Sequence, residues 1–372
     1  MFRFGAAGAL LVHAALLLAT PGLFGGADLL PHLRLIEDMD RDPAIRSVYA
    51  PGYHVLGALF GEGLGLAAYT RGFAFAAAAA LIAGFRSLQR AANLPDAASV
   101  IFAWSPYLFA LSWCTPKIEA AGYALALFSL AAILRRQYVL VGVTLTATFG
   151  FHTAAALFLG LCGGILALAR RDGRALGALA LGTLAATPLF AAHLAAGCSA
   201  AQSFLFSTGD YLRAGPDRSA TGGFWRVAVL AGPVAVAAAV VGGRELWNRD
   251  RPLCLVCSAI LVLYTNQLWL APFGFGTTLN LLRGLTILAI PVAIAGGLAL
   301  ARRPRIATAA LGLCVAWGVG SALLAVPGSC FVRSFSAAEI ASVSVDRCSF
   351  RWHKRRPIPG ESEDASAAPG AP

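Results

Sequence analysis

Apolar residues run through this chain in long blocks, and short polar connections rich in arginine separate the blocks. Many blocks come near the roughly 20 residues that an α-helix needs to cross about 30 Å of hydrocarbon. We predict membrane-spanning helices over residues 5–24, 64–85, 97–113, 118–134, 138–152, 153–169, 175–193, 225–243, 253–271, 284–300 and 306–326. The predicted fold is an all-α, polytopic transmembrane bundle of about 10–11 spans. This domain covers residues 1–326, and a C-terminal tail, 327–372, is expected to be largely disordered at its end.

Composition separates the chain from water-soluble proteins. Hydrophobic residues fill 58% of the 372 positions and charged residues 13%, whereas soluble domains are about half apolar and a quarter charged. The net charge of +11 is also found in nucleic-acid-binding proteins, but here it is gathered in the short connections, which is typical of membrane topology. We therefore expect membrane lipids around the protein and no nucleic acid as a partner.

Arginines mark every second connection, and such residues are retained on the cytoplasmic side during membrane insertion. With Arg3 inside, the intervening connections face outward, and an odd number of spans places the tail outside as well. The basic run Arg351–Arg356 opposes that placement of the tail. In an outward tail, Cys330 and Cys348 form either a disulfide or two free thiols. The inner connections carry Arg86 and Arg90; Arg135 and Arg136; Arg170, Arg171 and Arg174; Arg244, Arg249 and Arg251; and Arg302, Arg303 and Arg305.

The first outward connection carries many charged residues, and its apolar residues are spaced as in helices. Its apolar residues between Asp28 and Asp38 are spaced as on an amphipathic helix lying in the membrane interface. The apolar stretch after Tyr53 and His54 is too short to span and predicts an interfacial or re-entrant helix. Asp28 is either the N-cap of the first helix or a functional carboxylate. Tyr53 and His54 are either interfacial anchors or site residues.

Ionisable residues at membrane depth are expensive, and here they collect on the outward side. Beside the first loop, this side carries Lys117, Glu119, His152 and Arg283. A site that opens outward explains this asymmetry, and Asp28, Lys117, His152 and Arg283 are expected to meet in one cavity. No Walker A, G-x-G-x-x-G, H-E-x-x-H or G-x-S-x-G pattern occurs in the required context, which disfavours soluble-type nucleotide chemistry.

The first outer loop resembles that of the GT-C superfamily of polytopic glycosyltransferases. The features are an acidic residue just after the first span, the segment PHLRLIEDM, and a V-Y-A-P-G-Y-H entry to the next apolar stretch. The resemblance covers residues 5–326, and its specific part is 28–54. It implies a hexosyl- or pentosyltransferase that takes sugar from a polyprenyl-phosphate donor to a lipid or glycan acceptor. It also implies a multi-pass protein of the bacterial plasma membrane with an outward-facing site. A large soluble C-terminal domain, as in oligosaccharyltransferases, is absent, which disfavours peptide glycosylation.

The resemblance also implies roles for individual residues. Asp28 is the expected catalytic base or metal ligand. Asp38 and Asp40 resemble a D-x-D element and join Asp28 in a tentative Mg²⁺ or Mn²⁺ site, although they lie further from the span than that pattern requires; no other cofactor is expected. Cationic side chains suit the donor phosphate, because guanidinium groups bind phosphate oxygens bidentately. The phosphate-binding candidates are Arg283, Lys117 and Arg34, and the substrate-binding candidates are His32, Tyr53, His54 and His152.

Two other classes of function remain open. A transporter or lipid flippase also needs polar residues in the membrane, but such proteins usually place them near the midplane and often show paired halves. Here the charges lie at the outer edge and no matching second half is found. A noncatalytic membrane subunit would keep the same bundle without the chemistry. Asp28 is the feature that distinguishes the noncatalytic subunit from the enzyme.

Overall fold

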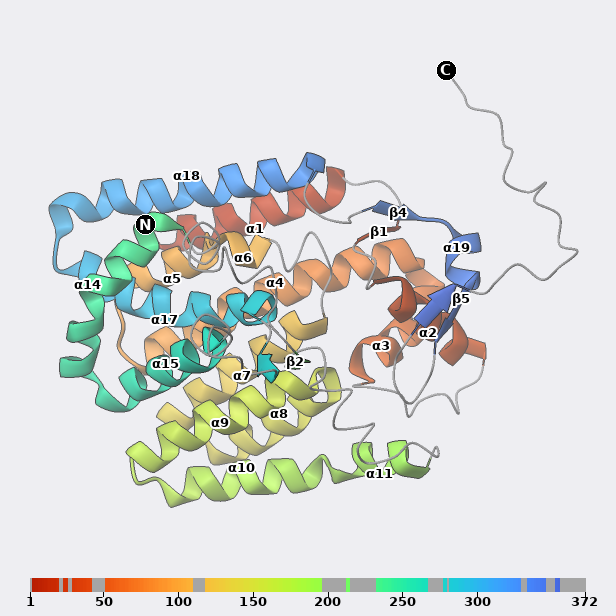
Figure 1. The fold of residues 1–372 in the computed structure, drawn as a ribbon, viewed down its shortest axis with the longest axis horizontal. Coiled ribbons are helices and arrows are strands. Elements are labelled where there is room, and N and C mark those ends of the chain that lie inside the picture. Colours follow the sequence, from red (N-terminus) through yellow and green to blue (C-terminus); the bar gives the residue numbers. More distant parts are fainter. Residues whose placement is uncertain are drawn as a thin grey trace, which may run out of the picture.

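The computed structural model describes residues 2–19, 23–25, 29–41, 51–109, 118–195, 212–214, 232–266, 277–279, 281–328, 333–345 and 352–354. The helices of the bundle are α1 (Phe2–Ala19), α4 (Leu66–Ala91), α5 (Asp96–Ala103), α6 (Pro106–Phe109), α7 (Ile118–Leu134), α8 (Tyr138–Phe151), α9 (Thr153–Ala169), α10 (Gly173–Ala185), α11 (Thr187–Ala195), α14 (Pro233–Arg249), α15 (Arg251–Tyr264), α17 (Leu281–Ala301) and α18 (Pro304–Gly328). Several long helices, such as α1, α4, α10, α17 and α18, lie along the long axis of the molecule (Figure 1).

Each predicted span corresponds to helix in this bundle, but two of them are divided. The span predicted at 97–113 breaks after α5, at Trp104 and Ser105, because proline at 106 disfavours helical conformation in the residue before it. The span predicted at 175–193 breaks at Ala186, just before Thr187-Pro188, for a similar reason. Both are therefore pairs of shorter helices.

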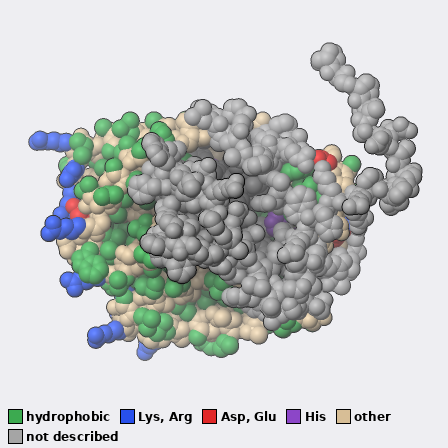
Figure 2. Space-filling model, in the orientation of Figure 1, with side chains coloured by type: hydrophobic (Ala, Val, Ile, Leu, Met, Phe, Trp, Pro, Cys, Tyr) green, Lys and Arg blue, Asp and Glu red, His purple; other side chains and the backbone are tan. Residues whose placement is uncertain are grey.

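Apolar side chains cover the outside of the bundle as well as its interior. Val139 is 82% exposed, Leu18 79% and Val240 79%, and green apolar patches are spread over the left part of the face drawn in Figure 2. Among the described helices, α4 is the one long and apolar enough by itself to cross a membrane, and several shorter apolar helices accompany it. An apolar exterior of this extent matches a lipid-facing surface.

Glycine lets the helix backbones approach closely. In α14, a Cβ atom placed on Gly242 would overlap the carbonyl oxygen of Ala295 in α17. The same applies to α4 against α7, where a Cβ on Gly84 would lie 2.9 Å from the carbonyl oxygen of Ala124. Small residues at such contacts are the usual means of packing helices in lipid, where no hydrophobic force drives them together.

The arginine-rich turns meet at one end of the bundle. Four polar contacts tie them together: Arg135 to Ser87 (2.9 Å), Arg170 to Asp250 (2.7 Å), Arg249 to the carbonyl oxygen of Asn93 (2.5 Å), and Arg302 to Glu245 (3.2 Å). Figure 2 shows the Lys and Arg side chains of this face at the same end. The predicted alternation of basic turns thus corresponds to one end of the molecule, which we call the basic end.

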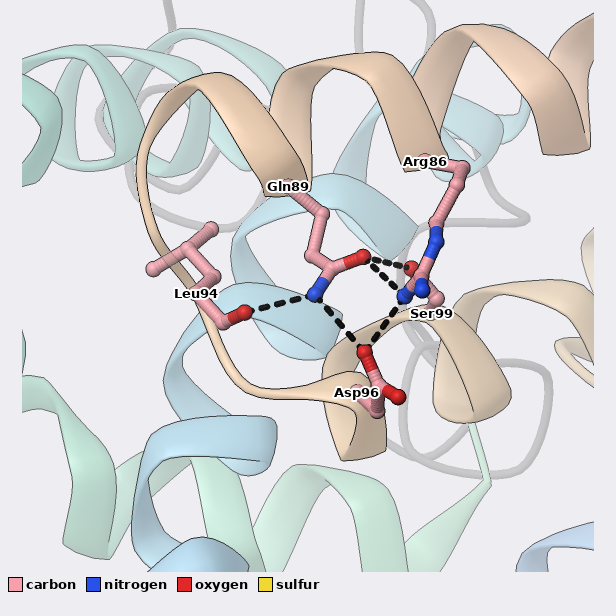
Figure 3. Close-up of polar contacts among 5 residues, drawn as sticks. All are labelled: Arg86, Gln89, Leu94, Asp96 and Ser99. Atoms are coloured by element: carbon pink, nitrogen blue, oxygen red, sulfur yellow. Dashed lines mark hydrogen bonds and ion pairs between the residues drawn. The ribbon is translucent and has the colours of Figure 1, made fainter. Parts of the chain in front are cut away.

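The α4–α5 turn shows how polar groups are satisfied at the basic end (Figure 3). Arg86 donates to Gln89 and to Asp96, at 2.5 Å each. The bond from Arg86 to Asp96 holds the pKa of the Asp96 carboxyl below its usual range. The buried Gln89 amide donates to the carbonyl oxygen of Leu94 and accepts from Ser99. These bonds hold the turn between α4 and α5 in place. They also pair both the NH₂ group and the oxygen of the buried Gln89 amide.

The opposite end carries the first outer loop and part of the tail, and we call it the loop end. It holds the two predicted short helices, α2 (Leu29–Arg41) and α3 (Gly52–Leu64). Three two-stranded antiparallel sheets were not predicted from the sequence: β1 (Leu23–Gly25) with β4 (Arg333–Phe335), β2 (Leu212–Ala214) with β3 (Thr277–Leu279), and β5 (Val343–Val345) with β6 (Trp352–Lys354). A short helix, α19 (Ala337–Ala341), lies between β4 and β5.

Replacing Gly242 with alanine should destabilise the bundle by about 1–3 kcal/mol, because the new methyl group forces α14 away from α17. Gly243→Ala is the matched control, since nothing lies within 4 Å of a Cβ at that position. Its stability should be unchanged or slightly raised, because alanine favours helix more than glycine does. Thermal unfolding of the purified proteins in detergent measures both, and an equal loss in the two variants would contradict the close contact.

Candidate functional site

Helix α2 has apolar side chains on more than one face. Different segments of the loop end pack against these faces and stabilise the helix. Leu29, Leu30 and Leu33 pack against residues of the tail, whereas Ile36 packs against Tyr53 and Tyr69 of α3 and α4. Glycine at position 57 of α3 permits the second contact, because a Cβ there would lie 2.5 Å from Ile36 Cδ1. The helix that carries His32, Arg34 and Asp38 is therefore held from two sides.

A histidine pair joins α2 to α3. His32 Nδ1 lies 2.9 Å from His54 Nε2, and the rings stack with centroids 5.1 Å apart. His54 is fully buried, and burial lowers its pKa to about 3, so this ring stays neutral at pH 7. A neutral imidazole has one donor and one acceptor nitrogen, so the bond to His32 fixes the tautomers of the two rings together. His32 is half-buried and is held in one orientation by this contact.

Tyr53 anchors the start of α3 in an aromatic cluster. Its side chain is fully buried, with the ring 4.7 Å from Phe73 and 5.3 Å from Tyr69, measured between centroids. Its hydroxyl lies 3.5 Å from the Thr70 hydroxyl, and Tyr69 donates to its backbone carbonyl at 2.5 Å. Tyr53 thus fixes the position of its neighbour His54, and it is a buried anchor, which differs from the interfacial ring considered above.

Arg34 is paired with acids of its own helix. Its guanidinium lies 2.9 Å from Asp38 and 3.4 Å from Glu37, at the i+4 and i+3 positions where helical side chains meet. The residue is only 9% exposed, so this charge is compensated where it is buried. This pairing engages one oxygen of the Asp38 carboxylate, which the sequence predicted as a metal ligand, and the metal site stays a prediction.

A second polar pair lies at the loop end between α7 and α9. His152 Nε2 is 3.8 Å from Glu119 Oε1, and both side chains are almost fully buried. His152 occupies the break between α8 and α9, where its Nδ1 accepts from the Ala155 N–H at 3.2 Å and caps α9. Because Nδ1 is an acceptor, the proton of the neutral ring is on Nε2, the nitrogen that faces Glu119. Glycine at position 122 permits this packing, since a Cβ there would lie 2.9 Å from His152 Cβ.

Aromatic residues connect the two pairs. Phe151, adjacent to His152, stacks on Phe73, which in turn contacts Tyr53. Gly52, at the start of α3, approaches Phe151 so closely that a Cβ would lie 3.0 Å from its ring. The structure thus links His32, Tyr53 and His54 with His152 through one packed cluster at the loop end. The Glu119 partner was noted in the sequence as a polar residue, and its buried pairing with His152 is new.

The side chains of the remaining predicted site residues lie outside those that the structure describes. Asp28 directly precedes α2, Lys117 directly precedes α7, and Arg283 is in the first turn of α17. Asp40 belongs to the last turns of α2. Their meeting in one cavity stays a prediction. Among the described residues, no group of three or more His, Cys, Asp or Glu side chains could hold a metal ion.

The C-terminal strap, residues 333–345, was missed from the sequence. Phe335, Ile340 and Val343 are buried against Leu30 and Leu33 of α2, and β4 of the strap pairs with β1, just before α2. A capping box starts its helix α19: Ser336 accepts from the Glu339 N–H, and Glu339 accepts from the Ser336 N–H. That S-x-x-E pattern is a known sequence signal for a helix start. The Cys330–Cys348 alternatives lie outside the described residues.

Protonation of His54 should destabilise the loop end in acid. Its pKa in the folded protein lies below the ordinary value of 6.5, so protons bind more readily to the unfolded chain and stability falls as pH drops from 6.5 toward 3. The loss should be on the order of 2 kcal/mol by pH 4.5. Thermal unfolding between pH 7 and pH 4.5 should show a smaller acid-induced decrease in His54→Gln than in the wild type. Identical decreases would mean that His54 does not remain neutral.

Disrupting the strap should loosen α2. Val343→Asp places a carboxylate in a position with no exposed surface, at a cost of about 2 kcal/mol or more. Ser344→Asp is the control, because successive side chains of a strand point to opposite faces and Ser344 is half-buried. Limited proteolysis should cut residues 23–41 faster in Val343→Asp than in the control. Equal cleavage would mean that the strap does not hold α2.

Comparison with known proteins identifies the fold. No family model matches the chain, and no curated protein matches its sequence. Its structure is similar to the crystal structure of ArnT from Cupriavidus metallidurans bound to undecaprenyl phosphate, with a TM-score of 0.62 and 16% sequence identity. The match covers 87% of this chain and 64% of that chain, so this protein spans less than two thirds of the length of ArnT. At this identity the likeness shows the fold: a polytopic helical membrane bundle of the GT-C type, as the first outer loop predicted.

Proposed function

We propose that this membrane protein transfers a sugar from a polyprenyl-phosphate donor to a lipid or glycan acceptor at its loop end. The observation that carries the proposal is the GT-C-type bundle shared with ArnT, a protein whose structure contains undecaprenyl phosphate. Fold alone does not define an activity. The second support is chemical, because two described polar pairs, His32 with His54 and Glu119 with His152, lie at one end of the bundle.

In the proposed reaction, an acceptor hydroxyl oxygen bonds to the anomeric carbon of the sugar. The bond from that carbon to the donor phosphate breaks, and the lipid phosphate leaves with the bonding electrons. A carboxylate must take the proton of the hydroxyl, and cations must stabilise the departing phosphate. We assign the first role to Asp28 and the second to Arg283 and Lys117.

The described residues have supporting roles in this proposal. The His32–His54 pair presents a half-buried imidazole from the helix that begins one residue after Asp28. An oriented imidazole is suited to hydrogen-bonding sugar hydroxyls, and buried Tyr53 and His54 hold it in place. His152 and Glu119 form a second polar wall beside the first turn of α7, close in sequence to Lys117. Arg34 is a weaker phosphate ligand than the other cations, because Asp38 and Glu37 already neutralise it.

A divalent cation remains a separate hypothesis. Its candidate ligands are Asp28, Asp38 and Asp40, and Asp38 is also paired with Arg34. No step of the proposed reaction requires the ion, since Arg283 and Lys117 supply positive charge for the leaving phosphate. Transfer measured with and without EDTA addresses the ion directly.

Asp28→Asn should abolish sugar transfer, because asparagine keeps the shape of the side chain but cannot accept the proton. The expected loss is about 10²-fold or more. The measurement is transfer of radiolabelled sugar from a panel of polyprenyl-phosphate donors by membranes containing the full chain. Glu62→Gln is the matched control: Glu62 is an exposed carboxylate on α3 at the same end, and its removal should leave transfer unchanged.

The outcomes separate the possible functions. Transfer by the wild type and by Glu62→Gln, but not by an equally stable Asp28→Asn, supports the enzyme and the base. Transfer retained in Asp28→Asn keeps the enzyme and rejects Asp28 as its base. Absence of transfer by the wild type across the panel would reject the proposal and favour a transporter or a noncatalytic subunit.

A further inference from the structure

The basic end contains a cavity that the proposed reaction does not use. Its volume is about 720 Å³, and it lies among three inner turns, which connect α7 to α8, α9 to α10, and α14 to α15. This volume falls within the range of about 300–1,000 Å³ that is typical of small-molecule sites. The charged residues that line it are Arg136, Arg170, Arg249, Arg251, Asp172 and Asp250.

The charges of this cavity do not balance. Four arginines and two aspartates line it, which leaves two positive charges in excess (4 − 2). Both carboxylates are already engaged on each oxygen. Asp172 caps α10 at the Ala175 N–H and accepts from Tyr138 at 3.1 Å. Asp250 caps α15 at the Leu253 N–H and accepts from Arg170 at 2.7 Å. The two acids therefore complete the wall and pair with one of the four arginines.

The other three arginines form no ion pair with a described carboxylate. Arg249 donates to the carbonyl oxygen of Asn93, and Arg251 lies over the Trp247 ring at 5.6 Å. The Arg136 side chain forms no hydrogen bond or ion pair with any residue that the structure describes. None of these guanidinium groups has a carboxylate partner among the described residues, and all three line the same space.

The backbone at Arg136 supplies a second observation. Its φ angle is +60°, in the left-handed region that costs an ordinary residue roughly 1–2 kcal/mol and that glycine adopts freely. The turn closes with bonds from Arg136 N to Ile133 O and from Gln137 N to Ala132 O, the arrangement in which glycine is usual. A strained arginine at the cavity wall, in place of glycine, points to a use for its side chain.

From these features we propose that the cavity binds a phosphate group, carried by an anionic lipid of the adjoining leaflet or free in solution. Guanidinium groups bind phosphate oxygens in pairs, and arginines from separate turns surround the group from different sides. Trp247 and Tyr138 beside the cavity are residues typical of the membrane–water boundary, the level of lipid headgroups. The site lies at the opposite end from the proposed transfer site and does not depend on that activity.

Two turns of the same geometry give a matched test. Arg171 also has a left-handed backbone, with φ +53°, in the α9–α10 turn, but it does not line the cavity. Arg136→Gly and Arg171→Gly each remove one positive charge and relieve the same backbone strain. Both variants should unfold at a higher temperature than the wild type. Only Arg136→Gly should lose phosphate binding, by about tenfold, and Arg136→Gly with Arg251→Gln should lose more.

The measurement uses the purified full chain and two probes. Phosphatidylglycerol binding, against phosphatidylcholine as the neutral lipid, is counted by native mass spectrometry, and inorganic phosphate is tested by its effect on thermal unfolding. Selective loss of phosphatidylglycerol in Arg136→Gly supports the site and identifies a lipid headgroup. Selective loss of stabilisation by inorganic phosphate supports it and identifies a soluble anion. Equal binding in Arg136→Gly and Arg171→Gly, or no binding by the wild type, would overturn the proposal and leave these arginines a role in membrane insertion alone.

Discussion

Hydrocarbon solvates neither charged side chains nor unpaired backbone groups, and each part of this structure is arranged around that constraint. The helices satisfy their own backbones, so their contacts are made by surfaces with few polar atoms. Glycine at positions such as 242 and 84 brings the helix axes close enough for dispersion forces to act. Charged residues are displaced to the two ends, and the two ends consequently acquire different chemistry.

The ends differ in how their polar groups are satisfied. At the basic end, arginines reach across turns to carbonyl oxygens, amides and capping aspartates, as in the Arg86–Gln89–Asp96 network (Figure 3). At the loop end, polar side chains are buried in pairs between helices, as with His32 and His54 or Glu119 and His152. Buried pairs of this kind hold geometry tightly, which suits a site for orienting a substrate.

The sequence predicted the bundle well because the apolar blocks that specify spans are local features. Helices α7, α8 and α9 begin and end within a residue of their predicted bounds, since Arg135-Arg136 and His152 interrupt the pattern there. Proline marked the breaks before positions 106 and 188, but an apolar run on both sides concealed them. The amphipathic helix after Asp28 could also be predicted, because its leucines follow the period of a helix.

Contacts between distant segments could not be predicted from the sequence. Val343 and Leu33 are far apart in the chain, and nothing in either local pattern specifies the other. The pairings of His32 with His54, of Glu119 with His152 and of Arg34 with Asp38 depend on rotamers and helix packing, although the i+4 spacing made the last one foreseeable. Polarity predicted that His32, His54 and His152 lie at one end of the bundle, where the structure has them, and three-dimensional packing determined their partners.

The pairing of β1 with β4 joins a strand that follows α1 to a strand that follows α18 (Figure 1). Ribosomes make Leu23–Gly25 before the intervening helices and Arg333–Phe335 after them, so the apolar side of α2 stays uncovered while those helices are made and inserted. The apolar side of α2 is therefore covered only after the segment that carries Phe335, Ile340 and Val343 has been made. A cut anywhere between residues 41 and 333 would leave the helices on each side of it able to form and would still remove this cover from the first loop.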